Sequence, residues 1–283
     1  MTIGFGATVA KRRLSRRLAE LRIKNGYTAN QVCDKLDWGR GKVGRFEANT
    51  WKLPEMSDIR DLLRIYQVED DDAQELMELA KLARTRAWWR EYGDVFGDSE
   101  HPGFEEDALR IRLYLPLILP GLLQTRSYID AHMRVGTQPT PWRKRALEAR
   151  LRRQAILDPS DGTAPELIAV ITEASLMYEW GSRADRRTQV AHLVEMSRRP
   201  RVELRLLRFA GGPHPGMSSL ISIFDFREDE PSMVYLQNDA AVQEVNRPSE
   251  VMDYAQIFDR IREAALDSAA TTAYLEKLAA TME

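Results

Sequence analysis

Cysteine is almost absent from this 283-residue chain, with Cys33 as its single representative. One cysteine excludes an internal disulfide framework and the zinc modules built from cysteine pairs, and it fits a reducing compartment. Cys33 falls on the apolar side of a predicted helix, which favours a buried and inert thiol over a reactive one.

Long apolar runs and an export signal are lacking as well. The most apolar stretch, Leu113 to Leu123, is interrupted by Pro116 and Pro120. It falls short of the ~20 residues that span a bilayer. At the start of the chain, apolar residues precede the basic run Lys11-Arg12-Arg13, which is the reverse of a signal peptide. We therefore expect a cytoplasmic protein that does not enter a membrane.

Residues for metal binding or catalysis are few and scattered. The four histidines form no H-E-x-x-H motif, and the sequence contains no G-x-S-x-G nucleophile turn. His214 lies in a loop of Gly and Pro, where we expect it to shape a turn. Gly39 to Gly44 matches G-x-G-x-x-G, but a predicted helix precedes it instead of the strand that a dinucleotide site needs. We expect no enzyme activity, no metal and no cofactor.

The net charge of −2 hides a strong asymmetry along the chain. Residues 1–52 hold twelve Lys and Arg against four Asp and Glu, a net charge of +8, which leaves −10 for the remainder. A basic head on an acidic body suggests an anionic partner for the head alone, although a solvated basic face would give the same numbers. The length of the chain favours two domains.

Apolar spacing and capping residues predict five short helices in the first ninety residues. Leu14, Leu18 and Leu21 recur at helical spacing, and Gly26 follows as a stop. Thr28 can cap a second helix. The second to fifth helices are predicted at Ala29 to Leu36, from about Arg40 to Glu47, from Pro54 or Ser57 to Tyr66, and after Glu69 to Asp72.

Two of these helices form a helix-turn-helix pattern around a three-residue turn, Asp37-Trp38-Gly39. Val43 and Phe46 hold the second of them against the core, so that Arg40, Lys42 and Arg45 point outward, where they can read base edges in the major groove. Basic residues of the first helix are better placed to meet phosphates. The predicted DNA-binding set is Thr28, Gln31, Arg40, Gly41, Lys42, Arg45, Lys52, Arg12 and Arg16.

The stretch Leu14, Thr28, Leu36-Asp37-Trp38, Arg40, Lys42-Val43, Arg45-Phe46-Glu47 and Pro54 resembles the xenobiotic-response-element-type (XRE) regulators, which share the lambda/434-repressor-like fold. That resemblance implies a DNA-binding transcriptional regulator. The sequence departs from the family's common form at Ala29, Gly39, Gly41 and Gly44, where the family has polar residues. These departures remove contact side chains and weaken the recognition helix.

Strand signals distinguish the remainder of the chain. We predict helices at Phe104 to Leu113, Ser127 to Arg134, Trp142 to Leu157, Asp185 to Arg198, Ser249 to Leu266 and Ser268 to Met282. Strands are predicted at Leu167 to Ile171 and Val202 to Leu207, and a hairpin at Leu220 to Phe226 with Met233 to Leu236. The expected architecture is a mainly α helix-turn-helix domain at 1–90, followed by a mixed α+β domain at 91–283.

Several segments of this second part occur in a recognisable order. They are Trp88-Trp89, Pro120-Gly121-Leu122-Leu123-Gln124-Thr125, Arg152-Arg153-Gln154, Glu173-Ala174-Ser175-Leu176, Arg199-Pro200 and His214-Pro215-Gly216. In this order they resemble the actinobacterial, antitoxin-like regulators that join an XRE helix-turn-helix to a large C-terminal domain. The resemblance implies a small protein partner encoded nearby, and the C-terminal domain as the place for a partner, an effector and dimer formation.

Our leading hypothesis is a homodimer that binds double-stranded DNA at a palindromic operator, because one short helix reads too few base pairs for useful specificity. A protein-interaction module, an antitoxin or scaffold with residual DNA binding, is the alternative that Ala29 and the three glycines favour. An enzyme with a DNA-binding head is the third. The operator, the sign of regulation, the effector and the dimer interface stay open.

Overall fold

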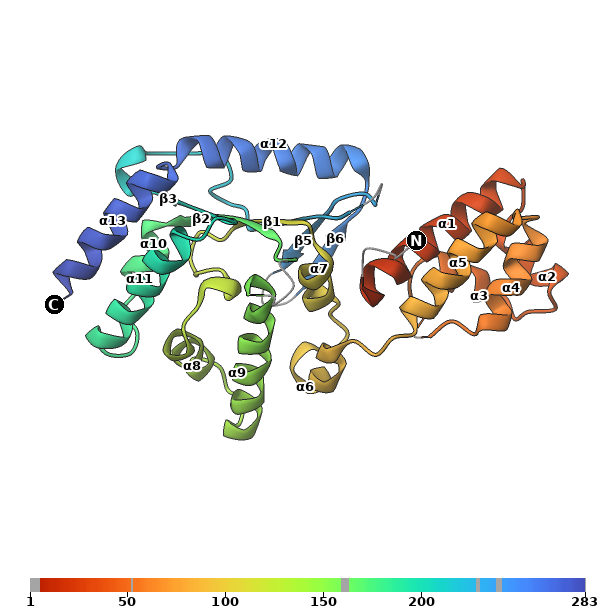
Figure 1. Cartoon of the computed structure of the whole chain (residues 1–283), viewed down its shortest axis with the longest axis horizontal. Coiled ribbons are helices and arrows are strands. Elements are labelled where there is room, and N and C mark those ends of the chain that lie inside the picture. Colours follow the sequence, from red (N-terminus) through yellow and green to blue (C-terminus); the bar gives the residue numbers. More distant parts are fainter. Residues whose placement is uncertain (1–5, 52, 159–162, 228–229, 238–240, 283) are drawn as a thin grey trace. The chain divides into compact units, whose positions relative to one another are not determined.

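A computed structural model describes residues 6–51, 53–158, 163–227, 230–237 and 241–282. The chain divides into two compact units, Met1–Glu91 and Tyr92–Glu283. Figure 1 shows helices in the first unit and a sheet with helices in the second, which confirms the expected combination of a mainly α domain and a mixed α+β domain. Among the helices of the described residues, none has both the length and the apolar character needed to cross a bilayer.

Five α-helices form the first unit within its described residues, and their apolar faces meet in one core. Leu14 and Leu18 of the first helix, Ile59 and Leu62 of the fourth, and Leu76 of the fifth are buried. The first helix packs along the fifth. The bounds are α1 Ala7–Lys24, α2 Ala29–Lys35, α3 Lys42–Glu47, α4 Met56–Ile65 and α5 Asp70–Ala83, with the short 3-10 helix η1 at Trp88–Tyr92.

A six-stranded mixed sheet, as far as the described residues show it, organises the second unit in the order β3-β2-β1-β4-β5-β6. Strands β1, β2 and β3 are parallel, whereas β4, β5 and β6 join in antiparallel fashion. The strand bounds are β1 Arg110–Tyr114, β2 Glu166–Thr172, β3 Val202–Leu207, β4 Ile221–Asp225, β5 Met233–Gln237 and β6 Val242–Val245. The predicted hairpin is the antiparallel pair β4 and β5.

Helices cover both faces of this sheet (Figure 1). Phe258 and Ile261 of α12 pack on Tyr114, Val170 and other apolar side chains of one sheet face. The helices between β1 and β3 lie on the other side of the sheet. The bounds are α6 Gly93–Phe96, α7 His101–Asp107, η2 Gly121–Leu123, α8 Arg126–Arg134, α9 Thr140–Gln154, η3 Ala155–Leu157, α10 Glu173–Met177, α11 Arg183–Ser197, η4 Phe209–Gly211, α12 Pro248–Ala264 and α13 Ser268–Thr281.

The helix predicted at Phe104 to Leu113 is wrong. The chain leaves α7 after Asp107 and enters β1, which pairs with β2 on one side and β4 on the other. From Arg110 to Leu113 exposed or half-buried arginines alternate with the buried Ile111 and Leu113, so the period is that of a strand. Because β1 has a strand on both sides, hydrogen bonding to its neighbours outweighs the local preference.

The segment Pro120 to Thr125, the most specific part of the resemblance, is fixed by side chains of α9 and α11. Gln154 donates to the carbonyl oxygens of Gly121 and Gln124 at 2.8 and 2.7 Å, and Gln189 donates to that of Leu123 at 2.8 Å. Buried carbonyl groups outside regular structure need such donors. These residues therefore have a structural role in this part of the chain.

Arg153, on the same helix as Gln154, forms a bidentate ion pair with Glu105, at 2.7 and 2.6 Å, although the Glu105 side chain is only 2% exposed. His101 lies 3.7 Å from this carboxylate and between the rings of Phe224 and Tyr235. Burial lowers the pKa of His101 to about 4. The charge of Arg153 also lowers this pKa, whereas the charge of Glu105 raises it. The imidazole is therefore neutral in the folded unit.

We predict that His101→Phe makes the second unit less sensitive to acid. In the folded wild type the pKa of His101 lies below its ordinary value of 6.5. The free energy of unfolding therefore decreases as the pH falls from about 6.5 towards about 4. Between about pH 7.5 and pH 5 the wild type should lose about 2 kcal/mol more than the variant. Urea denaturation at both pH values measures this, and parallel losses would contradict it.

Gly216 offers a second test of the packing. Its φ of +80° lies in the left-handed region, and a Cβ there would overlap Cδ1 of Ile261 and lie 3.5 Å from Tyr114. We predict that Gly216→Ala lowers the free energy of unfolding of this unit by about 2–4 kcal/mol. Hydrogen exchange of the β1 and β4 amides measures the loss.

Gly211→Ala is the matched control for this substitution. Gly211 lies in the same connection between β3 and β4, and nothing stands within 4 Å of an added Cβ. Its substitution should change stability by less than about 1 kcal/mol. If both variants were equally stable, the close approach of Gly216 to α12 would be refuted.

Candidate nucleic-acid interface

The first helix of the helix-turn-helix begins at a capping box. The Thr28 hydroxyl accepts from the Gln31 backbone N–H at 3.2 Å, and the Gln31 side-chain oxygen accepts from the Thr28 backbone N–H at 2.8 Å. This reciprocal pair satisfies two N–H groups that a helix start leaves open. Thr28 and Gln31, both predicted to bind DNA, therefore also define where α2 begins.

The connection between α2 and α3 has six residues, Leu36 to Gly41, where a three-residue turn was expected. The recognition helix consequently starts at Lys42 and leaves Arg40 in the turn. Gly41 is its N-cap, with φ at +85°, a conformation that side chains other than Gly rarely adopt. Of the three glycines expected to weaken the helix, only Gly44 lies inside it. Gly39 and Gly44 both have open space where a Cβ would stand.

Aromatic packing fixes the inner face of α3. Val43 and Phe46 are buried, as predicted. The Phe46 ring lies 5.6 Å from the ring of Trp51 and 6.3 Å from that of Trp38. The Trp51 indole N–H is shared between the Phe46 carbonyl and the Ser15 hydroxyl, both at 3.1 Å. The outer surface of this short helix is therefore held in a defined orientation.

Arg40 and Arg45 form the exposed cationic part of this surface. Arg45 Nη1 lies 3.7 Å from the position that a Cβ on Gly41 would occupy, so its guanidinium group extends back to the turn that carries Arg40. Within the described residues, neither side chain has an ion pair or hydrogen bond. The fold thus brings these two predicted residues to one end of α3, with both charges available to an anion.

Lys42 lies differently from the outward position expected for it. Its Nζ is 2.7 Å from Asp58 Oδ1 on α4, and it stands 4.0 Å above the centre of the Trp38 ring. The side chain is 31% exposed. Lys42 therefore connects α3 to α4, and its charge is already compensated inside the unit.

Several basic residues of α1 also have partners within the chain. Arg16 Nη1 lies 2.8 Å from Glu20 Oε1, and Arg13 lies 3.1 Å from Glu75 on α5. Arg12 and Arg16 are half-buried. Lys52, the remaining predicted contact, lies outside the described residues. The part played by all these residues in DNA binding stays a prediction.

Arg22 is the residue that sequence reasoning missed. Its Nε and Nη2 donate to Glu47 at 2.6 and 2.9 Å, and its Nη1 donates to the Tyr27 carbonyl at 2.7 Å. Hydrogen bonding to Glu47 raises the pKa of Arg22, while burial opposes it. One guanidinium group thereby joins α1, the approach to α2 and the end of α3. The two ionic partners stand 25 residues apart, and no local pattern reveals such a pair.

Comparison with protein-family models gives two matches. A model described as "Helix-turn-helix domain" matches residues 13–76, which include α2 and α3. A model described as "Domain of unknown function (DUF5753)" matches residues 99–277, more than half of the chain. The chain belongs to the DUF5753 family. Comparisons with curated proteins and with solved structures give no match.

These matches show an XRE-like helix-turn-helix at the N-terminus and a DUF5753 domain behind it. The first unit of this DUF5753 protein is therefore a DNA-binding helix-turn-helix domain. Among the described residues, no group of three or more His, Cys, Asp or Glu is placed to hold a metal ion.

We predict that Glu47→Ala lowers the free energy of unfolding of the first unit by about 2–3 kcal/mol, because it leaves the half-buried Arg22 without its anion. Glu20→Ala removes an exposed partner of Arg16 and Arg17 and should cost less than about 1 kcal/mol. Hydrogen exchange of the α1 amides compares the two. Equal losses would show that Arg22 does not hold the helices together.

Proposed function

We propose that this DUF5753 protein is a transcriptional regulator that reads operator DNA as a homodimer through the end of α3. The observation that carries the proposal is the pair of exposed guanidinium groups, Arg40 and Arg45, beside the Gly41 turn. Arginine matches the two acceptors of guanine in the major groove, and each such contact discriminates by ~1–3 kcal/mol. Because α3 is fixed by its partners, the backbone that carries these two groups needs no further ordering.

The other predicted contacts have supporting parts in this proposal. Gln31 uses its side-chain oxygen in the capping box, so its amide N–H groups can still donate to a phosphate. Arg12 and Arg16 on α1 and Lys52 supply positive charge that fixes register without reading sequence. Lys42 acts by holding α3 against α4. Base reading thus rests on two side chains.

A homodimer follows from the size of the reading surface. The recognition helix has six residues, and together with Arg40 it reaches only a few base pairs. Two copies on the two halves of a palindrome would double the site, which is the usual arrangement for helix-turn-helix regulators. We expect this complex to act in the cytoplasm, where its DNA is.

For the C-terminal unit we propose partner or effector binding without catalysis. The resemblance to antitoxin-like regulators suggests a small protein as that partner. The buried Glu105 carboxylate pairs with Arg153 and lies next to the neutral His101, so these polar groups are already engaged with one another inside the unit. The chain would thus join DNA reading in one unit to a regulatory input in the other.

A second candidate is an interaction module with weak DNA binding. The observation that favours it is the shortage of contact side chains, because Ala29, Gly39 and Gly44 offer none and Lys42 is already paired. On this hypothesis, deletion of residues 1–90 would leave partner capture intact while DNA binding would show no preference for any sequence.

We predict that Arg40→Ala and Arg45→Ala each weaken binding to the DNA upstream of the protein's own gene by about tenfold or more. Fluorescence anisotropy across a salt series, with a scrambled duplex of equal length, measures this. Arg40→Lys keeps the charge but loses the bidentate contact. It should therefore lower the preference for the upstream DNA while it retains the salt dependence.

Arg247→Ala provides the matched control, because the Arg247 side chain is 81% exposed in the other unit and its removal changes the net charge equally. This variant should bind like the wild type. Wild-type affinity in the Arg40 and Arg45 alanine variants would refute the assigned reading residues. Equal wild-type binding to both duplexes would favour the interaction module.

A further inference from the structure

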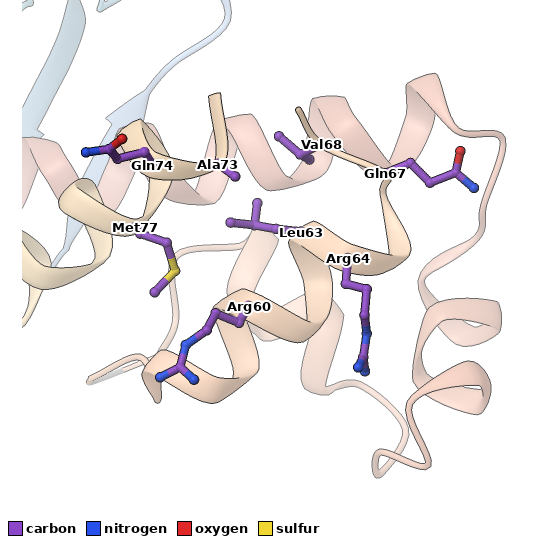
Figure 2. Close-up of a pocket in the computed structure, with 8 residues that line it drawn as sticks. All are labelled: Arg60, Leu63, Arg64, Gln67, Val68, Ala73, Gln74 and Met77. Atoms are coloured by element: carbon purple, nitrogen blue, oxygen red, sulfur yellow. The ribbon is translucent and has the colours of Figure 1, made fainter. Parts of the chain in front are cut away.

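A groove of about 330 Å³ runs between α4 and α5 of the first unit (Figure 2). It lies on helices that take no part in the helix-turn-helix itself. Leu63 from α4 forms its floor, and Ala73 and Met77 from α5, with Val68 of the connecting turn, complete the apolar lining. Leu63 is 5% exposed, whereas the other three are half-buried, so apolar surface remains for a partner to cover.

Charges of both signs flank this apolar lining. Arg60 and Arg64 stand one turn apart on the α4 side of the groove, as Figure 2 shows. Asp70, Asp71 and Asp72 form the first turn of α5, and Asp70 lies on the same helix face as the lining residues Ala73 and Gln74, three and four residues further on. Among the described residues, Arg60 and these three aspartates form no ion pair, while Arg64 has only the exposed Asp61 at 3.0 Å.

This combination restricts what can cover the groove. DNA or another polyanion would be repelled by the acidic start of α5, with Asp70 nearest the groove, and a purely acidic or purely basic protein surface would meet like charge on one side. A surface with the same two signs in the same arrangement satisfies both sides at once. In a two-fold contact between identical copies, each patch meets its own complement.

We propose that the groove between α4 and α5 is the surface through which two copies of this chain associate. Arg60 and Arg64 of one copy face the acidic start of α5 of the other, and the apolar linings meet between them. The inference rests on the homodimer of the proposed function and names its interface, which it places in the first unit instead of the C-terminal domain where dimer formation was expected. Because the uncovered apolar area is small, the association is weak in free solution and gains strength when two half-sites hold the copies together.

Charge reversal on opposite sides of the groove tests the proposal with the full chain and without DNA. One variant is Arg60→Glu with Arg64→Glu, and the other is Asp70→Lys with Asp71→Lys. Sedimentation equilibrium at up to about 0.1 mM should show self-association of the wild type. In each variant it should be weakened by about tenfold or more, because like charges then face each other. An equimolar mixture of the two variants should associate again.

The control is Lys24→Glu with Lys35→Glu, which changes the net charge equally at exposed positions outside the groove and should associate like the wild type. Circular dichroism verifies that all variants are folded. A monomeric wild type, a dimer insensitive to both reversals, or variants that stay apart when mixed would overturn the proposal. Because no DNA is present, these results are independent of whether Arg40 and Arg45 read an operator.

Discussion

The guanidinium group of Arg22 joins three segments around the recognition helix α3. With six residues, α3 is too short to be stable by its own hydrogen bonds, so its position comes from tertiary contacts. Besides the buried Val43 and Phe46, Arg22 supplies one of them, since it binds Glu47 at the end of α3 and the Tyr27 carbonyl ahead of α2. Lys42 and Asp58 add a second anchor towards α4. The outer surface of α3 is held in place because charged groups behind it are paired within the unit.

The C-terminal unit also uses long polar side chains to hold distant segments, here a loop with buried carbonyl groups. The Pro120 to Thr125 segment has buried backbone groups outside regular structure, and Gln154 and Gln189 provide the donors they need. Arg153 is held nearby by the carboxylate of Glu105. In both units, long polar side chains join segments far apart in the sequence. This accounts for the specificity of the motifs that carry the family resemblance.

Much of the fold could be predicted because its signals are local. The leucine spacing in α1 and the capping threonine of α2 each act within a few residues, and both predicted elements are present. Strand β1 was mistaken for part of a helix because its identity comes from β2 and β4, which lie far along the chain. The outward position of Arg40 and Arg45 followed from buried neighbours. The pairing of Lys42 with Asp58, and of Arg22 with Glu47, required the folded arrangement.

The open space around Gly39 and Gly44 has a consequence for how this reading surface can evolve. An added Cβ at either position would meet no neighbouring atom within 4 Å, whereas Gly41 between them is constrained by its left-handed backbone. New contacts to bases can therefore be acquired at two positions without disturbing the anchors of α3, as long as the residue between them stays unchanged. The open space at Gly39 and Gly44 also makes this turn a practical place to introduce side chains that change which DNA sequence is bound.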